Sequence, residues 1–158
     1  MESLFENCCN VMRALGNLLG LSYQEVCVVG NIYVQGALLV GATALPLWCA
    51  FKQQKHYMLK VVVGVNALCC WALVLYFCFR YAPPLDASFE RCVDDLKNLA
   101  IAWHTTYEMV NIVIFVLWWV GCITWNLLTT IFIGEGRGKI SMAMLLLHVS
   151  FLVFLWIG

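Results

Sequence analysis

The sequence VVVGVNALCCWALVLYFCF, residues 61–79, decides how the chain must fold. It contains 19 residues without a charged side chain and lies between Lys60 and Arg80. A helix of roughly 20 residues is long enough to cross the hydrocarbon core of a bilayer. Lipid offers no hydrogen bonds to the backbone, so an apolar run of this length must pair its own N–H and C=O groups as a helix. We therefore predict that residues 61–79 span a membrane.

Three further stretches without Asp, Glu, Lys or Arg have a similar length: residues 26–51, 109–133 and 140–158. The whole chain has the same character, because 63% of its 158 residues are hydrophobic and only 11% are charged. Its mean hydropathy is +0.86. These values lie outside the range of soluble domains. The expected fold class is all-α, a four-helix transmembrane bundle that forms a single integral membrane domain over residues 1–158.

Two other segments, residues 2–20 and 87–103, are predicted to form amphipathic interfacial helices. In both, apolar side chains recur three and four positions apart, which is the spacing of one helix face. Helices that bind anionic lipid usually carry many Lys and Arg on the polar face, and these two carry few. We expect both to dock onto the rim of the bundle rather than to bind lipid freely. Asp86 or Ser88 is the expected cap of the second helix.

The two halves of the chain repeat one order of features. Each half has an amphipathic segment, then a tyrosine and an acid, then an Asn-Ile pair near the start of a long span. These residues are Tyr23, Glu25 and Asn31-Ile32 in the first half and Tyr107, Glu108 and Asn111-Ile112 in the second. Identity between the halves is too low to prove a duplication, and any four-span protein divides into two pairs, so both interpretations stay open.

Positive charge is concentrated in the two short loops. Five of the nine basic residues are there: Lys52, Lys55, Lys60, Arg137 and Lys139. The N-terminal segment and residues 80–108 contain the other four, together with eight of the nine acids. Because cytoplasmic loops are enriched in Lys and Arg, we predict a multi-pass protein of the plasma membrane with the short loops in the cytoplasm and both termini outside. The reversed topology is the alternative.

Six of the nine cysteines lie in or at the ends of the apolar stretches, where cysteine behaves as a small hydrophobe. The other three, Cys8, Cys9 and Cys92, are outside the spans. The predicted topology puts them in an oxidising compartment. There, two of the three could form a disulfide that joins the N-terminal helix to the loop helix.

Several classes of protein are excluded because no Asp, Glu, Lys or Arg lies inside a predicted span. Ion-coupled transporters, proton pumps and voltage sensors retain such groups in the membrane. The chain also lacks the C-x-x-C pair of membrane thiol oxidoreductases and the regular Cys and His spacing of zinc sites. A net charge of zero without a basic run disfavours nucleic acid as a partner. We expect no catalytic residue, no cofactor and no bound metal.

Uncharged polar side chains are the remaining candidates within the spans. Asn31 and Gln35 stand four residues apart on one helix face, and Asn126 and Thr130 repeat this spacing. Such residues either form hydrogen bonds between helices or line a pore, and we expect the former. The full set of candidates for these contacts, or for a pore lining, is Asn31, Gln35, Asn66, Asn111, Asn126, Thr130 and His148.

Two stretches carry a resemblance to a known group of proteins. They are LSYQEVCVVGNIYVQ, residues 21–35, and YEMVNIVIF, residues 107–115. Both resemble the span beginnings of small four-span bacterial inner-membrane proteins, which start a span with tyrosine, acid and Asn-Ile. The resemblance implies a bacterial inner membrane as the location. It implies no activity and no functional residue.

The expected function is therefore non-catalytic. The chain would be a subunit, assembly factor or immunity-type protein that contacts lipid and acts through helix–helix contacts with another membrane protein or with a second copy of itself. The alternative is a passive small channel or pore formed by oligomerisation. An enzyme of lipid or thiol chemistry is a third and weaker hypothesis, since folds of this kind host many unrelated roles.

Cysteine labelling tests the predicted orientation. In intact cells, a membrane-impermeant maleimide should label a Lys97→Cys variant above the background of the native cysteines. It should leave a Lys55→Cys variant at background, because residue 55 is expected in the cytoplasm. Labelling of Lys55→Cys alone would reverse the orientation.

Overall fold

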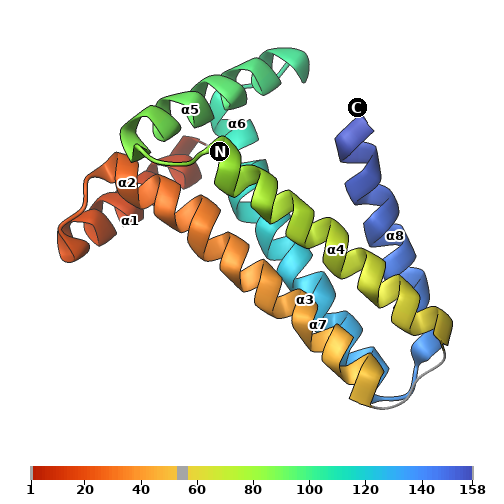
Figure 1. Ribbon diagram of the computed structural model, residues 1–158. Coiled ribbons are helices and arrows are strands. Elements are labelled where there is room, and N and C mark those ends of the chain that lie inside the picture. The colour runs from red at the N-terminus through yellow and green to blue at the C-terminus, as the bar shows by residue number, and fades with distance from the viewer. Residues whose placement is uncertain (1, 53–56, 158) are drawn as a thin grey trace. The chain divides into compact units, whose positions relative to one another are not determined.

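The computed structural model describes the backbone of residues 2–52 and 57–157 and the side chains of residues 3–52 and 57–150. Every regular element in these ranges is a helix (Figure 1). The all-α fold class is therefore confirmed for the described part of the chain. Lys55, which the topology prediction uses, lies outside the described residues.

Three helices are long and apolar enough to cross a membrane. The first, Tyr23–Lys52, comprises α2 (Tyr23–Val28), the π-helical segment η1 (Val29–Val34) and α3 (Gln35–Lys52). The second is α4 (Tyr57–Arg80). The third, Tyr107–Gly134, comprises α6 (Tyr107–Asn111), the π-helical segment η2 (Ile112–Trp118) and α7 (Trp119–Gly134). These three helices support the prediction that the chain is a membrane protein.

The fourth predicted span corresponds to α8 (Gly138–Ile157). The part of α8 whose side chains are described ends at Ser150 and is a shorter apolar helix. A bundle of four spans stays a prediction for this reason.

The tyrosine and acid of the repeated pattern lie in the first turns of two long helices. Ser22 caps α2, because its hydroxyl accepts from the Glu25 amide at 3.2 Å while the Glu25 carboxylate accepts from the Ser22 amide at 2.7 Å. This reciprocal pair is a capping box. Thr106 caps α6 in a similar way, since its hydroxyl accepts from the Met109 amide. Capping makes both helices begin a few residues before the predicted apolar spans.

The chain divides into two compact units, each built from two separate segments. Unit 1 comprises Met1–Gly36 and Tyr76–Val120, and unit 2 comprises Ala37–Leu75 and Gly121–Gly158. The prediction of a single integral membrane domain stays a prediction.

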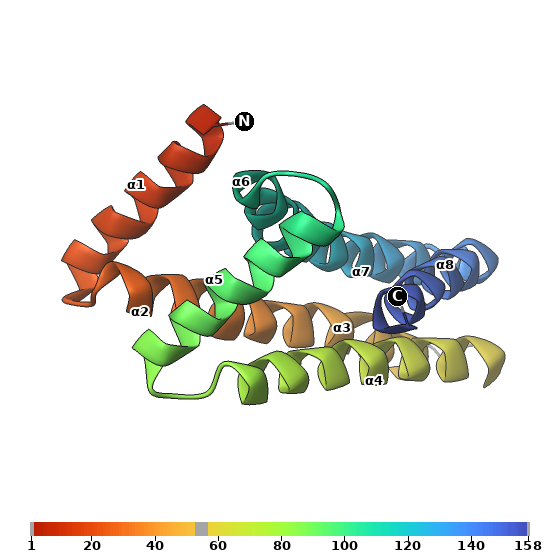
Figure 2. The same cartoon turned by 90° about the horizontal axis from the view of Figure 1, so that it is seen from above.

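In unit 1, the helices α1 (Glu2–Leu19) and α5 (Leu85–Ala102) pack against α2, and α5 also contacts α6 (Figures 1 and 2). Gly16 allows α1 to turn back onto α2, because a Cβ there would lie 2.8 Å from the Leu21 carbonyl oxygen. Such contacts are expected if α1 and α5 dock onto the ends of the spans. An apolar stripe of α1 nevertheless remains exposed, with Leu18 at 80%. A position at the membrane interface stays a prediction for both helices.

The beginning of α5 differs from the predicted one. The capping position is Pro84, without a side-chain cap, and both Asp86 and Ser88 lie inside the helix. The Ser88 hydroxyl is buried and donates to the Ala82 carbonyl at 2.6 Å, so it is engaged upstream instead of with the amides that follow it. The prediction that Asp86 or Ser88 is the cap was wrong.

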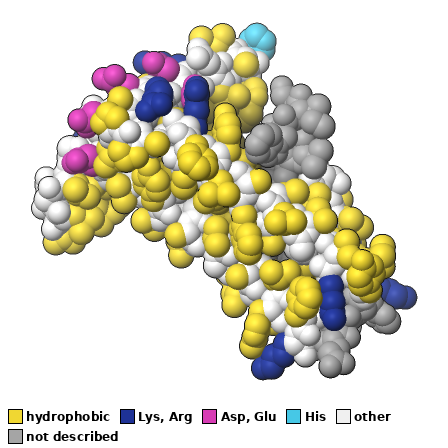
Figure 3. All heavy atoms as spheres, viewed as in Figure 1, with side chains coloured by type: hydrophobic (Ala, Val, Ile, Leu, Met, Phe, Trp, Pro, Cys, Tyr) yellow, Lys and Arg dark blue, Asp and Glu magenta, His cyan; other side chains and the backbone are white. Residues whose placement is uncertain are grey.

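An ion pair ties α5 to the end of α4 within unit 1. The Arg80 guanidinium donates twice to Asp95, with Nη2–Oδ1 and Nε–Oδ2 distances of 2.9 and 3.2 Å. The Tyr81 hydroxyl donates to the same carboxylate at 2.8 Å. Both charged side chains are partly exposed, so solvent screens the pair and it contributes little to stability. In Figure 3, acidic side chains gather over this unit.

The core of unit 2 is formed by side chains from α3, α4, α7 and α8. One cluster of buried apolar side chains in this core comprises Ala50, Leu59, Val63, Ile133 and Leu145. The outward faces of these helices carry many exposed apolar side chains as well (Figure 3). An apolar outer surface fits lipid as the surrounding solvent.

Candidate functional site

The predicted polar residues fall into two groups. In unit 2, Asn66, Asn126, Thr130 and His148 form one hydrogen-bonded cluster. In unit 1, Asn31, Gln35 and Asn111 line one cavity. The residues of the cluster are hydrogen-bonded to one another, whereas the residues of unit 1 surround a cavity.

Three side chains from three helices form the centre of the cluster. The Asn66 amide Nδ2 donates to Asn126 Oδ1 at 2.9 Å, which leaves Asn66 Oδ1 as an acceptor. His148 Nδ1 lies 2.8 Å from that oxygen. Nδ1 must therefore carry the proton, and Nε2 is the acceptor of the neutral ring. All three side chains are buried.

The outer bonds of the cluster complete this assignment. His148 Nε2 lies 3.4 Å from the Cys122 thiol, which can donate its S–H. Asn126 Nδ2 donates to the Cys122 carbonyl at 2.8 Å, and the Thr130 hydroxyl donates to the Asn126 carbonyl at 2.9 Å. The cluster is thus a neutral network that joins α4, α7 and α8.

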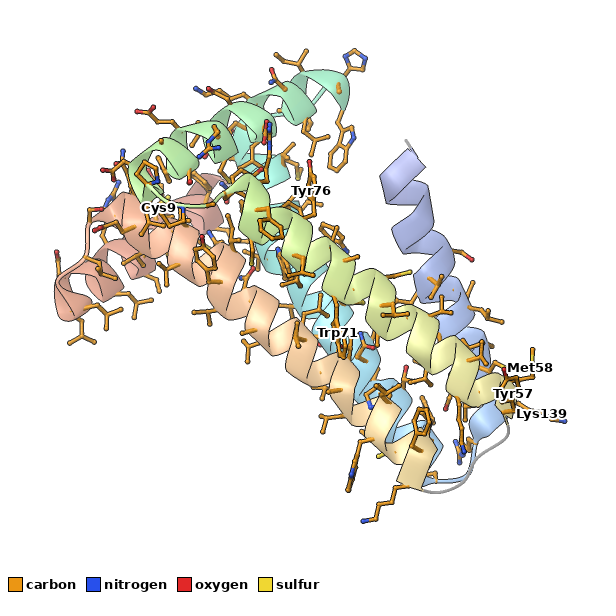
Figure 4. All side chains as sticks on the ribbon, viewed as in Figure 1. Cys9, Tyr57, Met58, Trp71, Tyr76 and Lys139 are labelled. Atoms are coloured by element: carbon orange, nitrogen blue, oxygen red, sulfur yellow. The ribbon has the colours of Figure 1, made fainter. Side chains whose placement is uncertain are left out.

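Residues outside the predicted set also join helices of unit 2. The indole N–H of Trp71, which is labelled in Figure 4, donates to the Thr43 hydroxyl at 2.9 Å. The Thr43 hydroxyl donates in turn to the Leu39 carbonyl of its own helix. Neither Trp71 nor Thr43 belongs to the candidate set, and neither does Cys122. For Cys122 the sequence holds a signal, because it stands four residues before Asn126 and so shares its helix face.

The cavity of unit 1 has a volume of about 330 Å³. It is formed by α1 and α5 together with the beginnings of both long helices of this unit. Its polar lining residues are Asn7, Tyr23, Asn31, Gln35, Tyr107 and Asn111, and its cysteines are Cys8, Cys9, Cys27 and Cys92. Cys9 is labelled in Figure 4, near the junction of α1 with α2 and α5.

The tyrosines and asparagines of the repeated pattern lie in the wall of this cavity. Tyr23 and Asn31 line it from the first long helix, and Tyr107 and Asn111 line it from the third. The tyrosines are engaged: the Tyr23 hydroxyl donates to Cys9 Sγ at 3.4 Å, and the Tyr107 hydroxyl accepts from Asn111 Nδ2 at 3.3 Å. The pattern therefore identifies corresponding parts of one wall, although it did not predict a cavity.

Both π-helical segments contribute to the same wall. Asn31 and Ile32 belong to η1, and Phe115 and Val116 belong to η2. Gln35, directly after η1, donates from Nε2 to the Phe115 carbonyl at 2.9 Å. Short π-helical segments occur frequently at functional sites.

The lining of the cavity carries no formal charge, since no Asp, Glu, Lys, Arg or His belongs to it in the described residues. Burial raises the pKa of the Cys92 thiol to about 12, and nearby Asp95 acts in the same direction. The thiol is therefore protonated near neutral pH. All nine cysteines are free, so the predicted disulfide among Cys8, Cys9 and Cys92 is not formed. Within the described residues, no group of three or more His, Cys, Asp or Glu could hold a metal ion.

Comparison with protein-family models, with curated proteins and with solved structures finds no match for this chain. The geometry of the two sites is therefore the basis of the functional argument.

The cluster predicts a measurable effect on stability. An Asn66→Leu substitution should lower the free energy of unfolding by about 1–3 kcal/mol, because it leaves His148 Nδ1–H and Asn126 Oδ1 buried without partners. Unfolding in mixed micelles, followed by tryptophan fluorescence, measures this. The matched control is Asn17→Leu on an exposed position of α1, which should change stability by less than about 0.5 kcal/mol. Equal effects of the two substitutions would contradict a stabilising role of the cluster.

Proposed function

We propose that the protein is a four-span integral membrane protein of a bacterial inner membrane, with both termini outside and with α1 and α5 at the interface. It acts without catalysis, as a subunit, assembly factor or immunity-type protein that contacts other transmembrane helices. The observation that carries this proposal is the internal pairing of the polar cluster. Because Asn66, Asn126 and His148 bond to one another, the outer surfaces of their helices are left apolar.

The outward face of α4 illustrates such a surface. Val61, Val65, Leu68 and Leu75 are exposed at intervals of four, three and seven residues. This spacing keeps the side chains on one stripe of a helix, the arrangement through which helices pack against each other. Neighbouring Leu73 is only 8% exposed and faces the interior. The stripe is therefore an apolar surface against which a partner helix can pack.

Photo-crosslinking tests this proposal. Leu68, which is 64% exposed, is replaced by p-benzoylphenylalanine, and the native membranes are irradiated before extraction. We expect one discrete cross-linked band, because a partner helix packed on the stripe lies within reach. The matched control is the same replacement at Leu73, which should give no band. Migration of the Leu68 variant as the uncross-linked chain alone would contradict helix contacts through this face.

A passive pore is the competing proposal, and conductance distinguishes it. We expect no single-channel current from the purified protein in planar bilayers, because a path lined by a few amides replaces little of an ion's hydration shell. The Asn31→Leu/Gln35→Leu variant is the control. A reproducible current in the wild type that disappears in this variant would favour the pore.

A further inference from the structure

The described basic residues of unit 2 all lie at one end of its helices. They are Lys52, Lys60, Arg137 and Lys139. Lys52 ends α3, Lys60 lies in the first turn of α4, and the other two flank the beginning of α8. Basic side chains gather at this end in Figure 3, and Lys139 is labelled there in Figure 4. We call these four residues the basic end of unit 2.

The buried apolar cluster of unit 2 joins the segments that carry these charges. Lys60 directly follows Leu59, which is a member of this cluster. A Cβ at Gly138 would lie 3.6 Å from Leu59 Cδ2, so the beginning of α8 adjoins the beginning of α4. The end of α3 is joined through Ala50, which belongs to the same cluster. The four basic residues therefore converge from three segments of the chain.

Little negative charge balances the basic end. Glu135 is the one acidic residue in the sequence of unit 2, and its carboxylate lies 3.3 Å from Nε of Arg137. The ion pairs of the described residues do not include Lys52, Lys60 or Lys139. Residues 53–56, between α3 and α4, add a further lysine and no acid to the sequence. This end of the unit therefore has an excess of positive charge.

Aromatic rings hold two of the lysines at the end of a long apolar helix. Lys52 Nζ lies 4.5 Å from the centre of the Trp48 ring, and Lys60 Nζ lies 5.3 Å from the centre of the Phe51 ring. Both rings belong to the last two turns of α3, and Trp48 is 60% exposed. Tryptophan at the end of a membrane span lies at the level of the lipid headgroups. The two ammonium groups are therefore held at the level of the lipid phosphates.

The surface beside these charges is apolar. Lys60 is followed directly by Val61, and Lys139 is followed directly by Ile140. Both apolar side chains are exposed. An anionic phospholipid offers a negative headgroup and a hydrocarbon chain together, whereas an acidic soluble protein would match the charge alone. Basic residues next to a membrane span attract anionic lipids electrostatically.

We propose that the basic end of unit 2 binds the headgroup of an anionic phospholipid. The ammonium groups of Lys52, Lys60 and Lys139 attract the lipid phosphate, and the acyl chains contact the adjacent apolar helix surfaces. The inference rests on the membrane insertion proposed above and adds a class of lipid to the partners of the protein. It does not depend on the helix contact at Leu68, because loss of that cross-link would leave the basic end unchanged.

Native mass spectrometry of the full-length protein in neutral detergent micelles tests this proposal, because it resolves the binding of single lipids. Phosphatidylglycerol and phosphatidylcholine with the same acyl chains are titrated separately. At low ionic strength we expect the Kd of the first phosphatidylglycerol to be about fivefold lower, which is the effect of one basic residue near a membrane surface. Raising the ionic strength to about 1 M should remove most of this preference, since salt screens the attraction.

Two triple variants separate charge from folding. Lys52→Gln/Lys60→Gln/Lys139→Gln removes the three lysines without an ion pair, and the two lipids should then bind with Kd values within about twofold of each other. Lys52→Arg/Lys60→Arg/Lys139→Arg keeps the charges and should keep the fivefold preference. A preference lost equally in both variants would contradict the electrostatic attraction.

The matched control removes the same number of positive charges from unit 1. It is Arg13→Gln/Arg91→Gln/Lys97→Gln, and it should keep the fivefold preference, because these residues belong to the other unit. An equal loss of preference in this variant and in the lysine-to-glutamine variant would overturn the proposal, since the effect would then follow from net charge alone.

Two results for the wild type would also overturn the proposal. Equal Kd values of the two lipids would instead favour an acidic protein as the partner of the basic end. Displacement of phosphatidylglycerol by inorganic phosphate, at an ionic strength at which chloride does not displace it, would indicate a site for free anions. Membrane insertion has its own readout, flotation of the wild type with phosphatidylcholine vesicles. Failure to float would contradict the proposed function, whereas flotation without a lipid preference would contradict only this inference.

Discussion

The fold depends on one constraint: inside a hydrocarbon core, a polar group must find its hydrogen-bond partner within the protein. Long apolar helices satisfy this condition for their backbones. The side chains of Asn66, Asn126 and His148 satisfy it by bonding to one another across three helices of unit 2. Because Asn66 bonds to both Asn126 and His148, these contacts fix which faces of α4, α7 and α8 meet.

The long helices could be predicted from the sequence because charge marks their ends. Lys52, Lys60 and Glu108 bound apolar runs of sufficient length, and the observed helices cover those runs. The residue at which each helix begins depends on its capping residues, and these lie outside the apolar runs. The first long helix begins at Tyr23 because Ser22 caps it, and the capping box gives hydrogen-bond partners to free amides of the first turn. Capping residues gave a wrong prediction at α5. There Ser88, at a plausible capping position, donates to a carbonyl six residues upstream.

The partners of the polar residues could not be predicted. A spacing of four places Asn126 and Thr130 on one face, but it does not say what faces them. Asn66 and His148 are 82 residues apart, and their contact follows only from how the helices of unit 2 pack. The cavity was missed for a related reason. The repeated tyrosine, acid and Asn-Ile pattern was visible in the sequence, whereas the two π-helical segments that bring Asn31 and Phe115 to one wall were not.

The two units thus treat buried polarity in opposite ways. In unit 2 each amide and imidazole of the cluster has a partner, so the network stabilises and offers nothing to a ligand. In unit 1 the Gln35 amide donates from Nε2 to the Phe115 carbonyl of η2. Polar side chains therefore join three helices in unit 2, whereas in unit 1 the bond from Gln35 joins the beginning of α3 to η2.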